Sequence, residues 1–494
     1  MTLQFKTDIP ARLDRLPWSK FHFLVVLALG ITWILDGWGV TIVSALSGVL
    51  KDSQALNLTD MQIGFCGTFY IAGSILGALV FGYMADRLGR KFLFSLTLVI
   101  YLIATALSGL SFNFWQFAFC RFLAGCAIGG EYSAINSAVD EFMPARIRGQ
   151  VNILVNGSYW LGTAMGSFST IFLLDPKLLP INLGWRLAFF LTVVLGLGIL
   201  LLRRFVPESP RWLIAHGRVK EAENIVKSIE EKIVKSTKKP LEKVTKFIVM
   251  RICKPAKFID IIAILFKNYK KRTYLSLALL ISQAFFYNSI FFTYALILIQ
   301  FYHIAPTTIG YYLLPFALGN FMGPLLLGRF FDTVGRRKMI FLTYFLSGVI
   351  LLISGYLFLL GLLTAVQQTI LWTIIFFFAS AGSSGAYLTV TEIFPLEIRS
   401  TAISFFYAIG IGVGGVFGPV IFASLIESQK AVNLFYGYTA AAVAMIAASF
   451  VAYVYGIDAE RKSLEEIASP LSEVPPAFEV ENKVVENLSK AVLQ

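Results

Sequence analysis

Two charged motifs each occur twice in this chain of 494 residues, and the two copies are separated by about half its length. One motif reads Gly-x-x-x-Asp-x-x-Gly-Arg followed by a second basic residue, with its aspartates at Asp86 and Asp332, 246 residues apart. The other reads Glu-x-x-Pro-x-x-x-Arg and begins at Glu141 and Glu392, 251 residues apart. Long apolar stretches lie between the motifs. Such a repeat predicts two related helix bundles in a membrane, the arrangement of many secondary transporters.

The composition agrees with a membrane protein, because 57% of the residues are hydrophobic and 14% are charged, against about 25% charged in soluble domains. A transmembrane helix needs about 20 mainly apolar residues. Twelve stretches meet this requirement: 21–50, 61–84, 92–111, 114–140, 149–174, 185–205, 272–300, 308–331, 339–361, 368–391, 398–426 and 433–456. The sequence therefore predicts an all-α membrane protein with twelve transmembrane helices, arranged as two pseudo-symmetric six-helix bundles.

A polar, Lys- and Glu-rich segment separates the sixth stretch from the seventh, and its helical pattern predicts cytoplasmic helices. The expected domains are an N-terminal bundle (1–205), linker helices (206–270), a C-terminal bundle (271–456) and a cytoplasmic tail (457–494). The net charge of +13 collects at every second loop. This alternation places both termini in the cytoplasm of a multi-pass protein of the cell (plasma) membrane. It argues against nucleic-acid binding, since no basic patch is interleaved with stacking aromatics.

Ionisable residues inside apolar stretches are costly and therefore mark candidate functional sites. Asp36 lies in the first stretch and Arg121 in the fourth, at comparable depths when counted at ~1.5 Å per residue. We expect them to face each other as an ion pair that exchanges a proton, although a static structural pair remains the alternative. Glu131 lies further along the fourth stretch, and is either a second proton or cation site or a part of the inner gate.

The repeated motifs place eight charged residues at predicted cytoplasmic helix ends, where they can pair with one another and with helix dipoles. We expect this network to hold the inner side shut in one conformation and to break in the other. Its members are Asp86, Arg90, Glu141, Arg148, Asp332, Arg336, Glu392 and Arg399.

Polar and aromatic side chains within the apolar stretches form a candidate solute site. Amides offer paired donors and acceptors for hydroxyl-bearing solutes, and aromatic rings stack on apolar faces. Hydrogen bonding between helices is the alternative role of the amides. The candidates are Asn156, Trp160, Gln283, Tyr287, Asn288, Asn320 and Tyr387.

These residues resemble the major facilitator superfamily, and within it the sugar porters, over about residues 15–460. The paired loop motif and the Pro207-Glu208-Ser209-Pro210-Arg211-Trp212 run after the sixth stretch carry the resemblance. By position, Asp36 and Arg121 match the proton-coupling pair of proton symporters, and Asn156, Gln283, Asn288 and Asn320 match sugar-binding positions. The chain departs from the pattern at Ser282 and at Ser383-Ser384-x-x-Tyr387, and its Gly129-Gly130-Glu131-Tyr132 run is closer to organic-acid and phosphate symporters.

The sequence thus predicts a proton-coupled symporter of a sugar or similar small polar metabolite, working by alternating access as a monomer without a cofactor or metal. A symporter of an organic acid or phosphate is the first alternative, with Arg121 as the clearest fixed positive charge. A non-transporting nutrient sensor is the second, although the tail is short for signalling. An enzyme is not expected, because the three histidines are scattered and no nucleophile–base or metal arrangement appears.

Overall fold

The computed structural model describes residues 4–46, 49–175, 177–238, 240–252, 256–291, 293–305 and 308–474, so the predicted tail is described only as far as residue 474. The N-terminal half contains β1 (Gln4–Thr7), α1 (Ile9–Asp14), α2 (Lys20–Ala45), α3 (Asp60–Leu88), α4 (Arg90–Gly109), α5 (Phe114–Phe142), α6 (Arg148–Leu173) and α7 (Ile181–Arg203). The central linker contains α8 (Pro210–Ala215), α9 (Val219–Thr237), β2 (Ile248–Arg251) and α10 (Phe258–Lys267). The C-terminal half contains α11 (Lys270–Phe291), α12 (Tyr294–Tyr302), α13 (Ile309–Thr333), α14 (Arg336–Leu359), α15 (Ala365–Glu392), α16 (Arg399–Gly410), a π-helical turn (Ile411–Gly415), α17 (Val416–Glu427), α18 (Ala431–Tyr455) and α19 (Leu464–Ile467).

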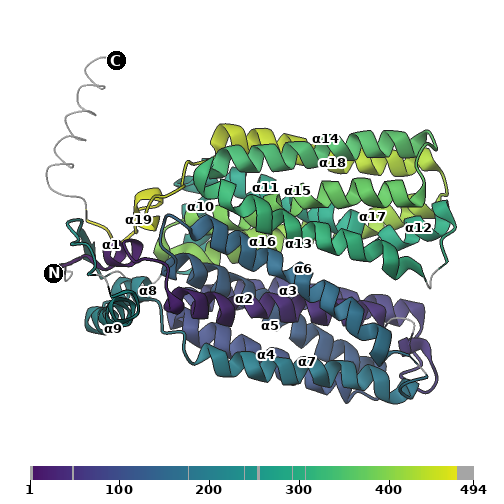
Figure 1. The fold of residues 1–494 in the computed structure, drawn as a ribbon, viewed down its shortest axis with the longest axis horizontal. Helices are drawn as coiled ribbons and strands as arrows, with labels where there is room; N and C mark the ends of the chain where they lie inside the picture. The colour runs from purple at the N-terminus through teal and green to yellow at the C-terminus, as the bar shows by residue number, and fades with distance from the viewer. Residues whose placement is uncertain are drawn as a thin grey trace.

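The long helices form two bundles that lie side by side (Figure 1). Helices α2 to α7 make the N-terminal bundle, and α11 to α18 make the C-terminal bundle. In the C-terminal bundle, α11 and α12 together form one membrane span, and so do α16 and α17. The bundles meet where α3 packs on α16 and α6 packs on α13. These two contacts are equivalent under the internal repeat, so the predicted twelve-helix, two-bundle architecture is confirmed.

Among the described residues, ten helical segments are long and apolar enough to cross a membrane. Helices α5 and α6 are not among them. Both have the length of a span, but α5 carries Arg121, Glu131, Asp140 and Glu141, and α6 contains several amide and hydroxyl side chains. Their polar residues are mostly buried, so these two helices cross the bundle with polar faces turned inward.

Small residues allow α3 and α5 to pack closely. A methyl group built on Gly73 would come within 2.1 Å of the Phe122 carbonyl oxygen, and one on Gly77 within 1.9 Å of the Cys126 carbonyl oxygen. Side chains at these positions would therefore push the two backbones apart, as expected for close helix packing in membranes.

The helices α1, α8, α9 and α19 lie together at one end of the bundles, at the left of Figure 1, which we call the linker end; the opposite end is the far end. Here β1 pairs antiparallel with β2, from Gln4 opposite Arg251 to Thr7 opposite Ile248. The helices of the linker were predicted, whereas the two strands were not. Four-residue strands have little periodicity, and this pair forms only because distant segments dock together.

Candidate functional site

A cavity of about 510 Å³ lies between the bundles, lined by α2, α3, α5 and α6 on one side and by α11, α15 and α16 on the other. Its lining runs from Leu50 and Ile63, near the far end, to Tyr132 and Tyr387 deep between the helices. Eight of the ten residues predicted for proton coupling or solute binding line it: Asp36, Arg121, Asn156, Trp160, Gln283, Tyr287, Asn288 and Tyr387. Glu131 and Asn320 do not.

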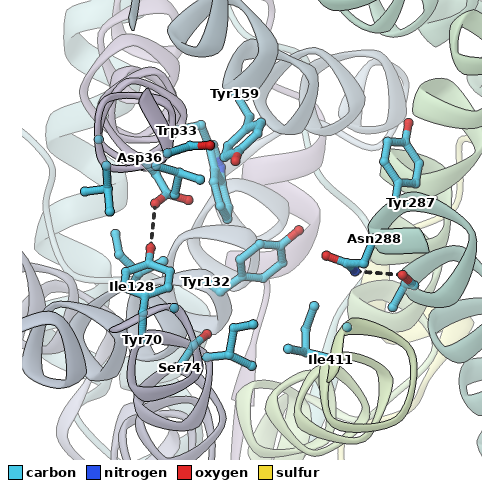
Figure 2. A pocket seen from close by; sticks show the side chains of 18 of the residues that line it. Trp33, Asp36, Tyr70, Ser74, Ile128, Tyr132, Tyr159, Tyr287, Asn288 and Ile411 are labelled. Carbon is cyan, nitrogen blue, oxygen red and sulfur yellow. Dashed lines mark hydrogen bonds between the residues drawn. The ribbon is translucent and has the colours of Figure 1, made fainter. Parts of the chain in front are cut away.

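The Asp36 carboxylate lies at the cavity wall with 7% of the residue exposed. Tyr70 on α3 donates a hydrogen bond of 3.2 Å to its Oδ1, as Figure 2 shows. None of the ion pairs recorded among the described residues involves this carboxylate. A buried carboxylate with one neutral donor is poorly compensated as an anion, which makes Asp36 a candidate site for a proton.

The predicted ion pair between Asp36 and Arg121 is not formed in this structure. The Arg121 guanidinium donates from Nε and Nη2 to Ser108 Oγ, at 3.2 and 2.7 Å. It lies over the Phe189 ring at 5.0 Å from the centroid. Residues of α4 and α7 therefore hold the guanidinium. The prediction compared only how deep Asp36 and Arg121 lie along α2 and α5, and such a comparison does not reveal partners on other helices. The two charges share one cavity but have separate partners.

Glu131 lies behind the cavity lining, where it forms an ion pair with Arg203 at the end of α7. The same guanidinium donates to Thr32 Oγ1 at 2.6 Å and to the Phe94 carbonyl oxygen. Arg203 is 1% exposed. In the sequence, Arg203 stands next to Arg204 and a polar linker, as an exposed arginine at a helix end would. The sequence analysis therefore did not identify it as a partner of Glu131. The pair joins α2, α4, α5 and α7 inside the N-terminal bundle.

The amide candidates form hydrogen bonds to neighbouring protein groups. Asn156 Nδ2 donates to Asn136 Oδ1 at 2.9 Å and to Asn152 Oδ1 at 2.8 Å. Gln283 donates to the Tyr387 hydroxyl at 2.9 Å. Hydrogen bonding between and within helices, the alternative role, thus accounts for much of their polarity.

Tyr287 and Asn288 on α11 face the cavity opposite Asp36 in Figure 2. Tyr287 donates to Asn320 Oδ1 at 3.0 Å, which places Asn320 behind the lining. Asn288 Nδ2 donates to the Ala284 carbonyl oxygen at 2.7 Å, which leaves its amide oxygen as an acceptor toward the cavity.

Aromatic rings cover much more of the cavity than the sequence analysis predicted. Trp160 and Tyr287, both predicted candidates, have their ring centroids 6.0 Å apart. The additional rings are Trp33, Tyr70, Tyr101, Phe117, Tyr132, Tyr159 and Tyr407. Trp33 is one helical turn before Asp36, and this spacing is the signal from which its face could have been predicted.

The eight charged residues of the repeated motifs meet at the linker end, and all eight are buried. Within the N-terminal bundle, Arg90 pairs with Asp86 and Glu141, both at 3.1 Å. Across the interface, Arg399 Nη1 lies 3.5 Å from Glu141 Oε1. The repeat-related contacts are Arg336 with Asp332 at 2.6 Å and with Glu392 at 3.0 Å, and Arg148 with Glu392 at 3.5 Å.

The two motif aspartates also cap helices of the opposite bundle. Asp86 accepts hydrogen bonds from the backbone N–H groups of Ser400 and Thr401, at 3.1 and 2.8 Å, at the start of α16. Asp332 accepts from the N–H groups of Gly149 and Gln150, at the start of α6. A carboxylate at a helix N-terminus is favoured by the helix dipole. These symmetric caps close the interface at the linker end.

The network continues into segments that the sequence analysis did not assign to it. Asp14 on α1 lies 3.3 Å from Arg148 and 3.1 Å from Arg211, and Arg211 pairs with Glu465 at 2.9 Å. Burial, opposed by the charges of Arg211 and Arg148, raises the pKa of Asp14 above its usual value. Burial likewise raises the pKa of Glu208, which accepts from the N–H of Arg90. The N-terminus, linker and C-terminal segment thus all dock at the closed end.

A family model described as "Sugar (and other) transporter" matches residues 38–470. The chain belongs to this family. Its members are transporters rather than enzymes, and the helical bundles described above are those of a multi-pass membrane protein. The predicted sugar porter-like resemblance is therefore confirmed.

Individual relatives differ in what they carry. The niacin transporter NiaP of Acinetobacter baylyi is 32% identical over 224 residues, 45% of this chain and 49% of that protein. The sialic acid transporter NanX of Escherichia coli is 27% identical over 181 residues, 37% of this chain and 43% of that protein. The matches thus span about half the length of these relatives. A structure of the proton:xylose symporter XylE bound to 6-bromo-6-deoxy-D-glucose has 19% identity, covers 91% of this chain and 98% of its own, and gives a TM-score of 0.74, which shows the shared fold.

Proposed function

We propose that this transporter is a proton-coupled symporter of a small polar metabolite that works by alternating access. The observation that supports this most is the place of Asp36. It is a buried carboxylate with no ion-pair partner among the described residues, at the wall of a central cavity, and the cavity is closed at the linker end by charges from both bundles. Such a carboxylate changes its proton affinity when its surroundings change, which is the requirement for coupling.

In the proposed orientation the linker end lies in the cytoplasm of a plasma-membrane protein, which the basic residues of the loops at that end support. In this assignment the structure is the inside-closed conformation, and the predicted domains 1–205, 206–270, 271–456 and 457–494 are the two moving bundles, their linker and the tail. The motif network is then the cytoplasmic gate. It breaks when the bundles rock apart at that end, and the cavity opens inward.

For the solute, a sugar remains our first hypothesis, since Asn156, Gln283 and Asn288 line the cavity with amide groups. A monocarboxylic acid is the second candidate. One observation favours it: the Arg121 guanidinium lines the same cavity with Ser108 Oγ as its recorded hydrogen-bond partner and no carboxylate partner among the described residues. Niacin and sialic acid, the solutes named for two relatives, both carry a carboxylate.

The test is uptake into proteoliposomes with an imposed pH gradient, for xylose, glucose, nicotinate, sialic acid and phosphate. We expect one of these solutes to accumulate against its gradient in the native protein. Asp36→Asn should abolish this accumulation while solute exchange persists, and Asp260→Asn, an exposed acid on α10, should behave as the native protein. Undiminished accumulation by Asp36→Asn would refute proton coupling through this residue, and accumulation of the anions alone would replace the sugar hypothesis by the acid.

A further inference from the structure

The floor of the cavity is a cluster of three tyrosine rings contributed by both bundles. Tyr132 on α5 lies 4.8 Å from Tyr387 on α15 and 4.6 Å from Tyr407 on α16, measured between ring centroids. The rings of Tyr132 and Tyr407 are stacked at 27°. The Tyr407 hydroxyl also lies 3.0 Å from Ser74 Oγ on α3. Tyr132 thus contacts two rings of the opposite bundle at the floor of the cavity.

This aromatic floor is distinct from the charged network at the linker end. Along α5, at ~1.5 Å per residue, Ser137 lies about 7.5 Å beyond Tyr132, and Glu141 lies about 13.5 Å beyond Tyr132. Ser137 Oγ lies 3.1 Å from Ser400 Oγ, and Glu141 lies 3.5 Å from Arg399. A path from the cavity to the linker end thus meets the tyrosine rings first, then the two serines, then the charges.

The floor is also tied to the helix that carries Asp36. The Trp33 ring packs edge-on against Tyr132 with its centroid 4.3 Å away. Arg203 binds both Thr32 and Glu131, the residues immediately before Trp33 and Tyr132. Since residues three and four positions apart share a helix face, the face of α2 with Asp36 reaches the Tyr132 region of α5 directly through Trp33 and indirectly through Arg203 of α7.

We propose that Tyr132 is the inner gate of the cavity, and that Trp33 and the Glu131–Arg203 pair position it according to the state of Asp36. The coupling part of this inference rests on the proposed function, in which Asp36 takes the proton. A movement of α2 displaces Trp33 and Thr32 together, so it shifts the Tyr132 ring relative to Tyr387 and Tyr407.

The barrier is tested with a cysteine placed below the floor. In protein whose native cysteines are replaced by serine, Ser137→Cys is exposed from the far end to a small membrane-impermeant methanethiosulfonate. Ser384→Cys, at a position that lines the cavity, serves as the accessible reference. We expect Tyr132→Ala to speed modification at position 137 about tenfold or more, as the loss of two ring contacts implies. Tyr132→Phe should retain the slow rate.

Tyr287→Ala removes a cavity ring that is not part of the floor, and should leave the rate at position 137 unchanged. Melting temperatures of all variants identify any that fail to fold, and Tyr407→Ala is a second way to open the floor. Equal rates at position 137 in native Tyr132 protein and in folded Tyr132→Ala and Tyr407→Ala proteins would overturn the gate. The gate would also be overturned if, in protein that retains Tyr132, the cysteine at position 137 were modified as fast as the cysteine at position 384.

The coupling is tested by combining Tyr132→Ala with Asp36→Asn. We expect Asp36→Asn to change the rate at position 137 severalfold when Tyr132 is present and to have no effect when it is alanine, a non-additivity that marks interacting residues. Equal effects in both backgrounds would overturn the coupling. This outcome can be distinguished from a failure of the proposed function. If the proposed function fails, the single variant Asp36→Asn still shows proton-driven accumulation in the uptake assay.

Discussion

Replacing Asp86 by asparagine should shift this protein away from the conformation that is closed at the linker end. The Asp86 carboxylate accepts hydrogen bonds from Ser400 N, Thr401 N and Thr401 Oγ1, at 3.1, 2.8 and 2.7 Å. All three donors belong to the opposite bundle, so these bonds exist only while the bundles are closed there. The contact with Arg90 lies within one bundle and is kept in both conformations.

The size of the shift follows from the charge that these bonds lose. Hydrogen bonds to a charged group contribute roughly 1.5–3 kcal/mol, about twice as much as neutral ones. The three bonds use both carboxylate oxygens, Oδ1 for Ser400 N and Oδ2 for the two Thr401 donors, whereas asparagine has one acceptor oxygen. With this oxygen toward Thr401, two bonds weaken by about 1 kcal/mol each, and the Ser400 N–H faces the amide NH2 and loses its acceptor at a cost of roughly 1.5 kcal/mol. A total of roughly 3.5 kcal/mol changes the equilibrium between closed and open conformations about 350-fold.

The assay is pulsed electron–electron resonance between spin labels on Leu88→Cys and Val334→Cys in a cysteine-free background. Both residues are exposed, and they lie at the linker ends of α3 and α13, in opposite bundles. We expect the longer-distance population to grow in Asp86→Asn. The repeat-related Asp332→Asn should act in the same direction, and the exposed Asp260→Asn should have no effect.

Unchanged distance distributions in both Asp86→Asn and Asp332→Asn would refute the reasoning that the helix caps hold the linker end closed. An equal shift in Asp260→Asn would show that the response is not specific to the interface.

Two further predictions concern packing and docking. Gly77→Ala places a methyl group against the backbone of α5, which costs about 1–3 kcal/mol; its melting temperature in detergent should fall by several degrees, whereas Gly67→Ala, with open space on the same helix, should match the native protein. Although burial opposes it, hydrogen bonding to arginines of the N-terminal segment, Arg12 among them, lowers the pKa of Glu230 below its usual value. The docking free energy of that segment is therefore fully present above the unfolded pKa of about 4.3 and is lost as the pH falls through the lower folded value. Hydrogen-exchange protection factors in β1 and α1, which correct for the slower intrinsic exchange at lower pH, should fall over that range and in Glu230→Gln at neutral pH, but not in Glu231→Gln; equal protection in both variants would contradict it.

The repeat in the sequence determined the architecture before any coordinates. Paired motifs, twelve apolar stretches and a polar centre require two six-helix bundles, because a membrane tolerates few other ways to satisfy backbone hydrogen bonds. The same motifs gave the eight charged residues at one end, and the structure brings them together across the interface. Residues such as Asp36 were identifiable because a charge within an apolar stretch is costly wherever the helix points.

Which partner each charge finds was decided by the tertiary structure alone. Arg121 turns to Ser108 rather than to Asp36, and Glu131 pairs with Arg203, whose place beside the polar linker concealed it. The tyrosine floor was not predicted either, because a ring in an apolar stretch has the same sequence signal whether it faces lipid, a neighbouring helix or a cavity. The spacing of residues along a helix determines how deep each residue lies in the membrane and which residues share a helix face. The contacts of a side chain also depend on how the neighbouring helices are rotated and packed, which a local sequence pattern does not show.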